Sequence, residues 1–308
     1  MRHIELLRLT NRITPAELAS FPGTGDLVVC DFYVEGIETG EEVAGGYRQG
    51  RILNVDHHAP TPRMWRRVSS TNLALERFEA DGALGDDAVV VINHLDCDSI
   101  LSSGIASGRL APDPRFGEAA IAADHTGEEN DIADLLQGLD AELTRRKIRD
   151  YEIPFENLRR LLDGRPLEPL ATEALDVRRR RRQAAAALVS QGRFQRVGPL
   201  HFAILDEPME GELFPALLPD ATAIMLANPL PEDRTRWQVR IRLGLSAPSG
   251  FALSLLGIRD FDPNYGGRWN AASNTRVDPS RGPRGTALDP EEYARRLVER
   301  LEASLPAG

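Results

Sequence analysis

The chain has 308 residues, 42% of them apolar and 27% charged, which is enough to bury a large core and to form two domains. No apolar stretch approaches the length of a membrane helix, and the formal net charge of −10 argues against indiscriminate binding to long nucleic acids. Residues 1–5 carry charges where a secretory signal has its apolar segment, so we expect a cytoplasmic protein. Its two cysteines, Cys30 and Cys97, are then expected to be reduced thiols in the core.

Four short apolar segments in the first half of the chain each lead into an Asp or an Asp/His cluster. They occupy residues 27–31, 52–58, 89–98 and 119–125. Short apolar runs separated by helical stretches, here about 70–81 and 99–107, are typical of buried strands in a parallel sheet. Because the ligand site of such sheets lies outside the carboxyl ends of the strands, five Asp and four His should gather at one edge. A pair of divalent metal ions would satisfy so many carboxylates and imidazoles.

The middle of the chain is predicted to be helical. Residues 131–149 and 155–163 have helical patterns with one polar face, and turn residues near 164–169 mark a linker, with 164–172 as a candidate hinge. A long helix follows over about 172–190 and carries five consecutive arginines, 178–182. Such a run suits nucleic-acid binding, but on a helix it points in all directions, which favours a solvated helix.

From about residue 194 the pattern changes to a second, smaller α/β domain. Segments 201–205, 221–227 and 237–245 are predicted strands, and 250–256 and 290–305 are predicted helices. Between Arg234 and Arg284 there are nine Arg and three Asp, with neither Glu nor Lys. These arginines either grip a phosphate substrate or occupy scattered solvated positions, and the sequence leaves both interpretations open.

The acidic and imidazole side chains have a spacing that suits metal binding. The candidate ligands are Asp31, His57, His94, Asp96, Asp98 and Asp124. In an extended loop the alternate residues His94, Asp96 and Asp98 face the same side. Two carboxylates two residues apart can each bind a different ion of a close pair, with Asp31 as the candidate bridge. Oxygen and imidazole ligands favour Mn²⁺, with Mg²⁺, Co²⁺ or Zn²⁺ as alternatives.

Several segments carry recognisable motifs. They are Val-Asp-His-His at 55–58 followed by Ser-Ser-Thr-Asn at 69–72, His-Leu-Asp-Cys-Asp-Ser at 94–99, Asp-His-Thr-Gly at 124–127, and Tyr-Gly-Gly-Arg-Trp-Asn-Ala-Ala at 265–272. Together they resemble the DHH phosphoesterase superfamily, which includes RecJ, nanoRNase and exopolyphosphatase-like enzymes. The last segment resembles the glycine-rich loop of the DHHA1-like substrate domain, and 239–242 resembles the strand before it. The motif order looks permuted, because Asp31 and 55–58 precede His94, and Arg268 stands where the loop usually has His.

The resemblance implies an α/β protein with a parallel-sheet catalytic domain over 1–165, a linker and connecting helix over 166–193, and a smaller α/β substrate-binding domain over 194–308. It implies that His94 and Asp96 hold the first ion, that Asp31 bridges, and that the second ion is held by Asp98, His57 and Asp124.

The resemblance also implies the remaining site residues. His58 would face the phosphate or the leaving oxygen, and Asp56 would orient a neighbouring imidazole. His125 has no clear counterpart in the family, and the sequence leaves open whether it contacts phosphate as a catalytic residue or only packs. The implied substrate-binding residues are Arg240, Arg242, Gly266, Gly267, Arg268, Asn270 and Arg276.

The implied activity is that of a Mn-dependent phosphohydrolase which cleaves short oligonucleotides or small nucleotides, of the nanoRNase or 3′-phosphoadenosine-phosphate phosphatase type, by two-metal activation of water. Tyr265 and Trp269 flank the glycine loop and could stack on a base, which favours nucleotides over polyphosphate or pyrophosphate, the alternative within the enzyme class. The alternative of another class is a catalytically silent nucleotide-binding module. We expect a small phosphorylated substrate as partner, no membrane and no long nucleic acid, and a homodimer stays open.

Overall fold

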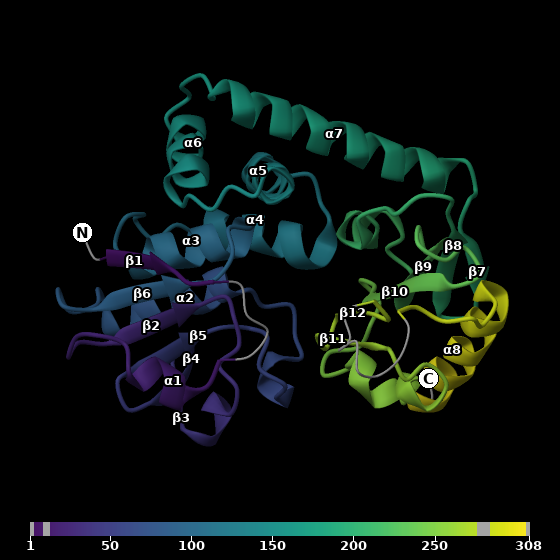
Figure 1. Cartoon of the computed structure of the whole chain (residues 1–308), viewed down its shortest axis with the longest axis horizontal. Helices are drawn as coiled ribbons and strands as arrows, with labels where there is room; N and C mark the ends of the chain where they lie inside the picture. The colour runs from purple at the N-terminus through teal and green to yellow at the C-terminus, as the bar shows by residue number, and fades with distance from the viewer. Residues whose placement is uncertain (1–2, 9–12, 276–283, 306–308) are drawn as a thin grey trace. The chain divides into compact units, whose positions relative to one another are not determined.

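The computed structural model describes residues 3–8, 13–275 and 284–305 (Figure 1). The chain divides into two compact units, the first formed by 1–124 and 129–180 and the second by 125–128 and 181–308. The boundary at residues 180 and 181 therefore falls inside the helix Pro169–Ser190, and the short segment 125–128 belongs to the second unit. Whether these units act as the catalytic and substrate-binding domains expected above stays a prediction. Among the described residues, no helix is both long and apolar enough to cross a membrane.

The described strands of the first unit form one six-stranded sheet in the order β1-β6-β2-β5-β4-β3. They are β1 (His3–Leu6), β2 (Leu27–Cys30), β3 (Glu41–Val43), β4 (Gly46–Gln49), β5 (Ile52–Val55) and β6 (Val89–Ile92). The first four strands in that order are parallel, and β4 and β3 continue the sheet in antiparallel fashion. Every residue of β2 and β5 is buried, as expected of central parallel strands. The predicted α/β class and three of the four predicted N-terminal strands are confirmed.

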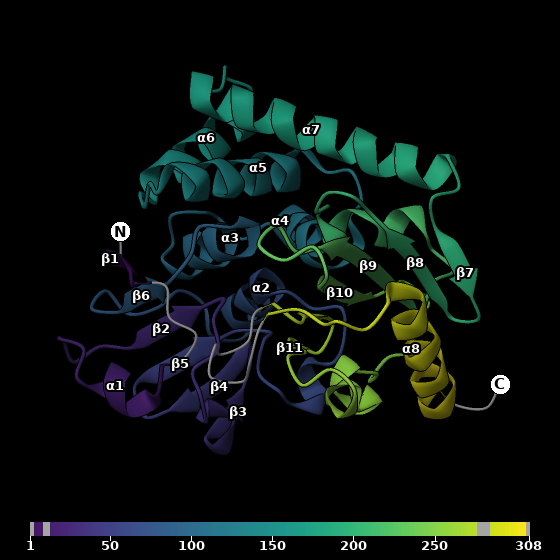
Figure 2. The same ribbon diagram turned by 45° about the vertical axis from the view of Figure 1, so that its right-hand side comes forward.

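The helices of this unit are α1 (Pro15–Ala19), α2 (Ser70–Asp81), α3 (Cys97–Ala106), α4 (Pro114–Ile121), α5 (Asp131–Arg146), α6 (Glu152–Leu162) and the first part of α7 (Pro169–Ser190). In Figures 1 and 2, α3 and α4 lie between the sheet and the pair α5 and α6. The start of α2 is fixed by a capping box between Ser69 and Asn72. The helices predicted over 70–81, 131–149, 155–163 and 172–190 are confirmed within a few residues at their ends.

The fourth predicted strand is wrong. Residues 119–123 belong to α4 and to the π-helical turn Ala122–Thr126 that follows it. Asp113 caps α4 and Pro114 occupies its first turn, and alanine favours helix more than any other residue. The apolar run therefore forms the buried end of a helix and not a strand. Asp124 lies in the π-helical turn that follows, and turns of this kind often occur at functional sites.

The extended loop expected over 94–98 is also incorrect. The chain turns directly from β6 into α3, so that Asp96 is the N-cap of the helix and Asp98 lies in its first turn. The convergence of these carboxylates is produced by a strand-to-helix turn and not by the alternation of an extended chain. The same turn brings Cys97 into the core, and Cys97 and Cys30 are both free and buried, as predicted.

Helix α7 packs closely on α5 in the first unit. A Cβ atom on Gly138 would lie 2.7 Å from the carbonyl oxygen of Ala174, so only glycine allows this approach. Arg178 and Asp134, both at least 96% buried, face each other there at 3.5 Å. Within their own units, Arg179 pairs with Asp131, Arg181 with Glu210, and Arg182 donates to the carbonyl of Gly127. The arginine run is thus largely occupied by internal contacts, which favours the structural interpretation over nucleic-acid binding.

The described strands of the second unit form another six-stranded sheet, in the order β11-β12-β10-β9-β8-β7. They are β7 (Gln195–Val197), β8 (Leu200–Ile204), β9 (Ala223–Pro229), β10 (Trp237–Leu243), β11 (Gly266–Gly267) and β12 (Ala271–Ser273). Only β8 and β9 are parallel; the other described pairs are antiparallel. Helix α8 (Pro290–Ser304) lies beside this sheet (Figure 2) and buries Tyr293 and Leu297 in its core. The three predicted strands and the terminal helix are confirmed, whereas 250–256 contains only the 3₁₀ turn Leu253–Leu256.

Candidate metal centre

The first unit brings the predicted ligands together at the carboxyl end of its parallel strands. Asp31 follows β2, His57 follows β5 and His94 follows β6. Asp31 has a left-handed backbone, with φ of +59°, a conformation that costs energy for most residues and that Asp tolerates better than most. Strained backbone of this kind is commonly held at functional sites by the surrounding structure.

One group of ligand atoms is formed by Asp31, His94 and Asp96, all within 4.8 Å of one another. The Nε2 atom of His94 lies 3.1 Å from a carboxylate oxygen of Asp31 and 3.2 Å from one of Asp96. These are the three residues that the resemblance assigns to the first ion.

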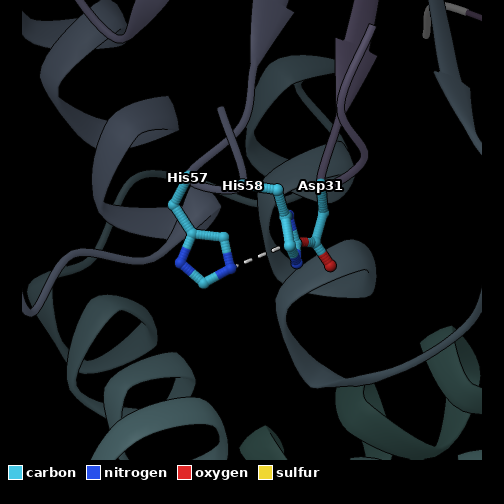
Figure 3. Close-up of side chains that lie close together, drawn as sticks. All are labelled: Asp31, His57 and His58. Carbon is cyan, nitrogen blue, oxygen red and sulfur yellow. Dashed lines mark ion pairs between the residues drawn. The ribbon is translucent and has the colours of Figure 1, made fainter. Parts of the chain in front are cut away.

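A second group is formed by His57, Asp98 and Asp124, again with ligand atoms within 4.8 Å of one another. The Nε2 atom of His57 lies 3.3 Å from Asp124 and 3.8 Å from Asp98. The same Nε2 lies 3.8 Å from Asp31, the ion pair drawn in Figure 3. A third group, Asp31, His57 and His58, overlaps the other two, so Asp31 lies beside a histidine of each group, as a bridging carboxylate requires.

Burial sets the protonation of the cluster. Asp31, His57 and Asp98 are each at most 1% exposed. Burial raises the pKa of Asp31, and the nearby Asp98 and Asp96 carboxylates raise it further. Burial alone would lower the pKa of His57, but Asp124, Asp98 and Asp31 outweigh it and raise this pKa to about 10. Buried carboxylates in excess over imidazoles need positive charge, so the donor set fits divalent cations bound through oxygen and imidazole nitrogen.

Hydroxyl and amide groups hold the two central carboxylates in place. The hydroxyls of Ser70 and Ser99 donate to the two oxygens of Asp31, at 2.9 and 2.8 Å. The backbone amides of Ser70 and Thr71, in the first turn of α2, each donate to Asp98 at 2.7 Å, and the Thr71 hydroxyl donates at 2.6 Å. The positive end of α2 thus favours the ionised form of Asp98. Sequence reasoning missed these supports, although hydroxyls in the first turns of two helices next to acidic motifs are a usable signal.

Each of the three imidazoles has a different partner on its Nδ1 atom. For His57 it is the carbonyl oxygen of Val68 at 2.7 Å, and for His94 the side-chain oxygen of Asn93 at 2.6 Å. For His58 it is the carboxylate of Asp56 at 2.5 Å. Fixing Nδ1 of His57 and His94 turns their Nε2 atoms toward the carboxylates, as metal-binding imidazoles require. Asp56 holds Nδ1 of His58 in the same way, and the roles that the resemblance implies for this pair stay predictions.

The predicted residues outside this cluster lie in the second unit. His125 is 6% exposed, and its Nδ1 lies 3.2 Å from the side-chain nitrogen of Asn270. The centroid of its ring lies 5.9 Å from that of the Trp269 ring, and the two ring planes are inclined by 37°. Arg240, Arg242 and Arg268 line one cavity of about 250 Å³.

The glycine loop lies beside that cavity. Gly266 and Gly267 line a neighbouring cavity of about 330 Å³. A Cβ atom on Gly267 would lie 2.6 Å from the carbonyl oxygen of Ala271, so this turn requires glycine. Arg276 lies outside the described residues.

No family model and no curated protein matches the sequence. Among solved structures, the chain is similar to a pGpG-specific phosphodiesterase, PggH, from Vibrio cholerae, with 12% identity and a TM-score of 0.48. The similarity covers 74% of this chain and 88% of the other. A likeness at this level carries no argument about function, so the functional proposal rests on the geometry of the cluster.

Proposed function

We propose that this protein is a metal-dependent phosphohydrolase that cleaves phosphoester bonds of short oligonucleotides or small nucleotides. The observation that carries the proposal is the position of the buried Asp31, which lies beside His94 and Asp96 on one side and beside His57 and His58 on the other. Bound there, two divalent cations supply Lewis acidity that lowers the pKa of water and neutralises phosphate charge. His94 and Asp96 would hold the first ion with Asp31, and His57, Asp98 and Asp124 would hold the second. The oxygen-rich ligand set favours Mn²⁺.

The pair of Asp56 and His58 is suited to handle the proton of the leaving group. Asp56 holds Nδ1 of His58, and the backbone amide of His58 donates to the other oxygen of Asp56 at 3.0 Å. Burial alone would raise the pKa of Asp56, but the His58 imidazole outweighs it and lowers this pKa, so Asp56 stays ionised. Nδ1 of His58 also lies 3.8 Å from Asp31, the same separation as that between Nε2 of His57 and Asp31. An imidazole held by a buried carboxylate is suited to general acid catalysis, so His58 is assigned to donate a proton to the leaving oxygen.

The second unit is proposed to bind the substrate through Arg240, Arg242 and Arg268. Guanidinium groups hold phosphate oxygens in paired hydrogen bonds and stay charged at any physiological pH. Unlike the histidine that usually stands in the glycine loop, Arg268 cannot transfer a proton near neutral pH, so it contributes binding and not acid–base chemistry.

The test is a hydrolysis panel with the full chain, stripped of metal and then supplied with Mn²⁺. The substrates are a dinucleotide, 3′-phosphoadenosine 5′-phosphate, a cyclic dinucleotide, pyrophosphate and polyphosphate. We expect Mn²⁺-dependent release of mononucleotide or phosphate from the nucleotide substrates and binding of about two ions per chain by elemental analysis.

The other outcomes separate the alternatives. Preferential turnover of pyrophosphate or polyphosphate would replace the nucleotide substrate by the inorganic one. Binding of two ions without turnover of any phosphoester would identify a nucleotide-binding module. Asp206→Asn, an exposed position in the second unit, serves as a control that should leave both turnover and ion binding unchanged.

A further inference from the structure

The cavity lined by Arg240, Arg242 and Arg268, here called the arginine cavity, lies on one face of the sheet of the second unit. The antiparallel register places side chains from β9, β10 and β12 in two neighbouring rows, Leu226–Arg240–Ser273 and Ile224–Arg242–Ala271. All six residues line the same cavity of about 250 Å³. Across the sheet, the floor thus changes from an apolar strip on β9, through two guanidinium groups on β10, to a hydroxyl on β12.

The cavity also has an acidic wall, which nothing in the sequence drew attention to. Glu210, Gly211 and Glu212 line it from the 3₁₀ turn Gly211–Leu213 and the residue before it. A carboxylate oxygen of Glu212 lies 3.9 Å from the guanidinium of Arg242, which fixes this wall beside the guanidinium row. The side chain of Glu212 is 24% exposed, so a ligand in the cavity can contact it. A carboxylate accepts about four hydrogen bonds, so one that already pairs with protein groups still accepts from a ligand.

A ligand for this cavity needs three features. It needs anionic or acceptor atoms for Arg240 and Arg242, a flat apolar face for Ile224 and Leu226, and N–H donors for the carboxylate wall. A nucleotide supplies the first two through its phosphate and its base. The third distinguishes the bases, because guanine carries two adjacent donors, N1–H and N2–H, that match the two oxygens of one carboxylate. Adenine offers a single amino group and uracil a single N–H, each beside acceptor atoms that a carboxylate repels.

The geometry points to a guanine nucleotide as the ligand of this cavity. The Glu212 carboxylate accepts hydrogen bonds from N1–H and N2–H of the base, and Arg240 and Arg242 bind the phosphate. This inference deepens the proposed function and rests on it for the nucleotide nature of the ligand. Glu212 is here a specificity-determining residue. The competing role, in which Glu212 only positions Arg242, makes no distinction between bases.

The experiment is calorimetric titration of the full-length protein with GMP, AMP and inorganic phosphate. We expect GMP to bind about tenfold or more tightly than AMP, since a site built to pair with N–H donors rejects a ligand that lacks them. Glu212→Gln should weaken GMP binding about tenfold or more and leave AMP and phosphate within about threefold, because one acceptor is exchanged for a donor. The matched control is Glu207→Gln, an exposed position outside the lining, which should bind all three ligands as the unchanged protein does.

Two results would overturn the inference. Equal binding of GMP and AMP to the unchanged protein removes the base preference. An equal loss of GMP, AMP and phosphate binding in Glu212→Gln shows that the carboxylate acts only through Arg242.

The titration also separates this inference from the proposed function. If the protein hydrolyses nucleotides without preference for guanine, the inference fails and the function stands. If it binds GMP selectively but hydrolyses no phosphoester, the function fails and guanine recognition stands.

Discussion

The carboxylate cluster of the first unit and the arginine cavity of the second differ in charge, burial and hydrogen bonding. In the cluster, Asp31 and Asp98 are almost completely buried, and hydroxyls or helix amides hold their oxygens. In the cavity, Arg242 and Glu212 are partly exposed and meet at 3.9 Å. The first arrangement fixes atoms closely enough for metal-assisted chemistry, whereas the second presents partly exposed charged groups that a ligand can contact. Chemistry and recognition are thus expected to be separable by mutation.

The largest expected effect is that of Asp31→Asn on the cluster. Asn keeps the size of the side chain and tolerates the left-handed backbone of this position, but it removes the charge shared by both ligand groups. We expect kcat to fall by about a thousandfold or more and bound metal to fall below two ions per chain. Elemental analysis and steady-state kinetics measure both, with Asp206→Asn as control. Near-normal turnover in Asp31→Asn would show that Asp31 is not a ligand of the metal centre.

A smaller effect is expected from Asn93→Leu, which removes the oxygen that orients His94. Loss of such an outer partner typically costs about 10- to 100-fold in metal affinity or activity. Asn93→Asp keeps the acceptor and should recover most of the Mn²⁺ affinity, measured by titrating activity against Mn²⁺. Equal loss in both variants would mean that Asn93 acts through packing and not through its hydrogen bond.

The cavity is tested by Arg240→Gln, with the exposed Arg234→Gln as its matched control. Removing one guanidinium contact to phosphate should raise KM about tenfold while kcat changes little, because the lost interaction serves binding. Metal stoichiometry should stay the same. A fall in kcat at unchanged KM would assign Arg240 to the chemical step and blur the separation between the two regions.

The pH dependence of stability sharpens the comparison further. In the metal-free protein the pKa of His57 is raised to about 10, so the folded state binds a proton that the unfolded state loses above about pH 6.5. The contribution of His57 to the free energy of unfolding is complete below pH 6.5. It is lost as the pH rises to about 10, by at most about 1.4 kcal/mol per pH unit. Asp31 and Asp98, whose pKa values burial raises, act in the same direction.

Thermal unfolding with chelator and with saturating Mn²⁺ measures this dependence. We expect the Tm of the metal-free protein to fall from pH 6.5 to 9.5 and the Mn²⁺-loaded protein to resist the fall, because bound cations replace the protons. Parallel curves in the two conditions would show that the cations do not bind at this cluster.

The sequence predicted which side chains come together better than it predicted the way in which the chain presents them. Asp31, His57 and His94 could be found because each follows an apolar run whose strand ends at a common edge. The apolar character of alanine predicts a strand over residues 119–123, but the high helix preference of alanine places them in a helix and a π-helical turn.

The supporting contacts were beyond sequence reasoning for a physical reason. The bond from Ser99 to Asp31 joins residues 68 positions apart, and that from Thr71 to Asp98 joins residues 27 apart, so only tertiary packing creates them. Glu212 likewise becomes a candidate binding residue only because the fold places it 3.9 Å from Arg242, which lies on another element. Short pieces such as β7 and β11 gave no periodic signal at all.

The central claim, that two ions share Asp31, is tested most directly by anomalous diffraction at the manganese edge from crystals of the full chain grown with Mn²⁺. We predict two anomalous peaks, one beside His94 and Asp96 and the other beside His57, Asp98 and Asp124, with the Asp31 carboxylate between them. A single peak, or peaks away from these residues, would contradict the account.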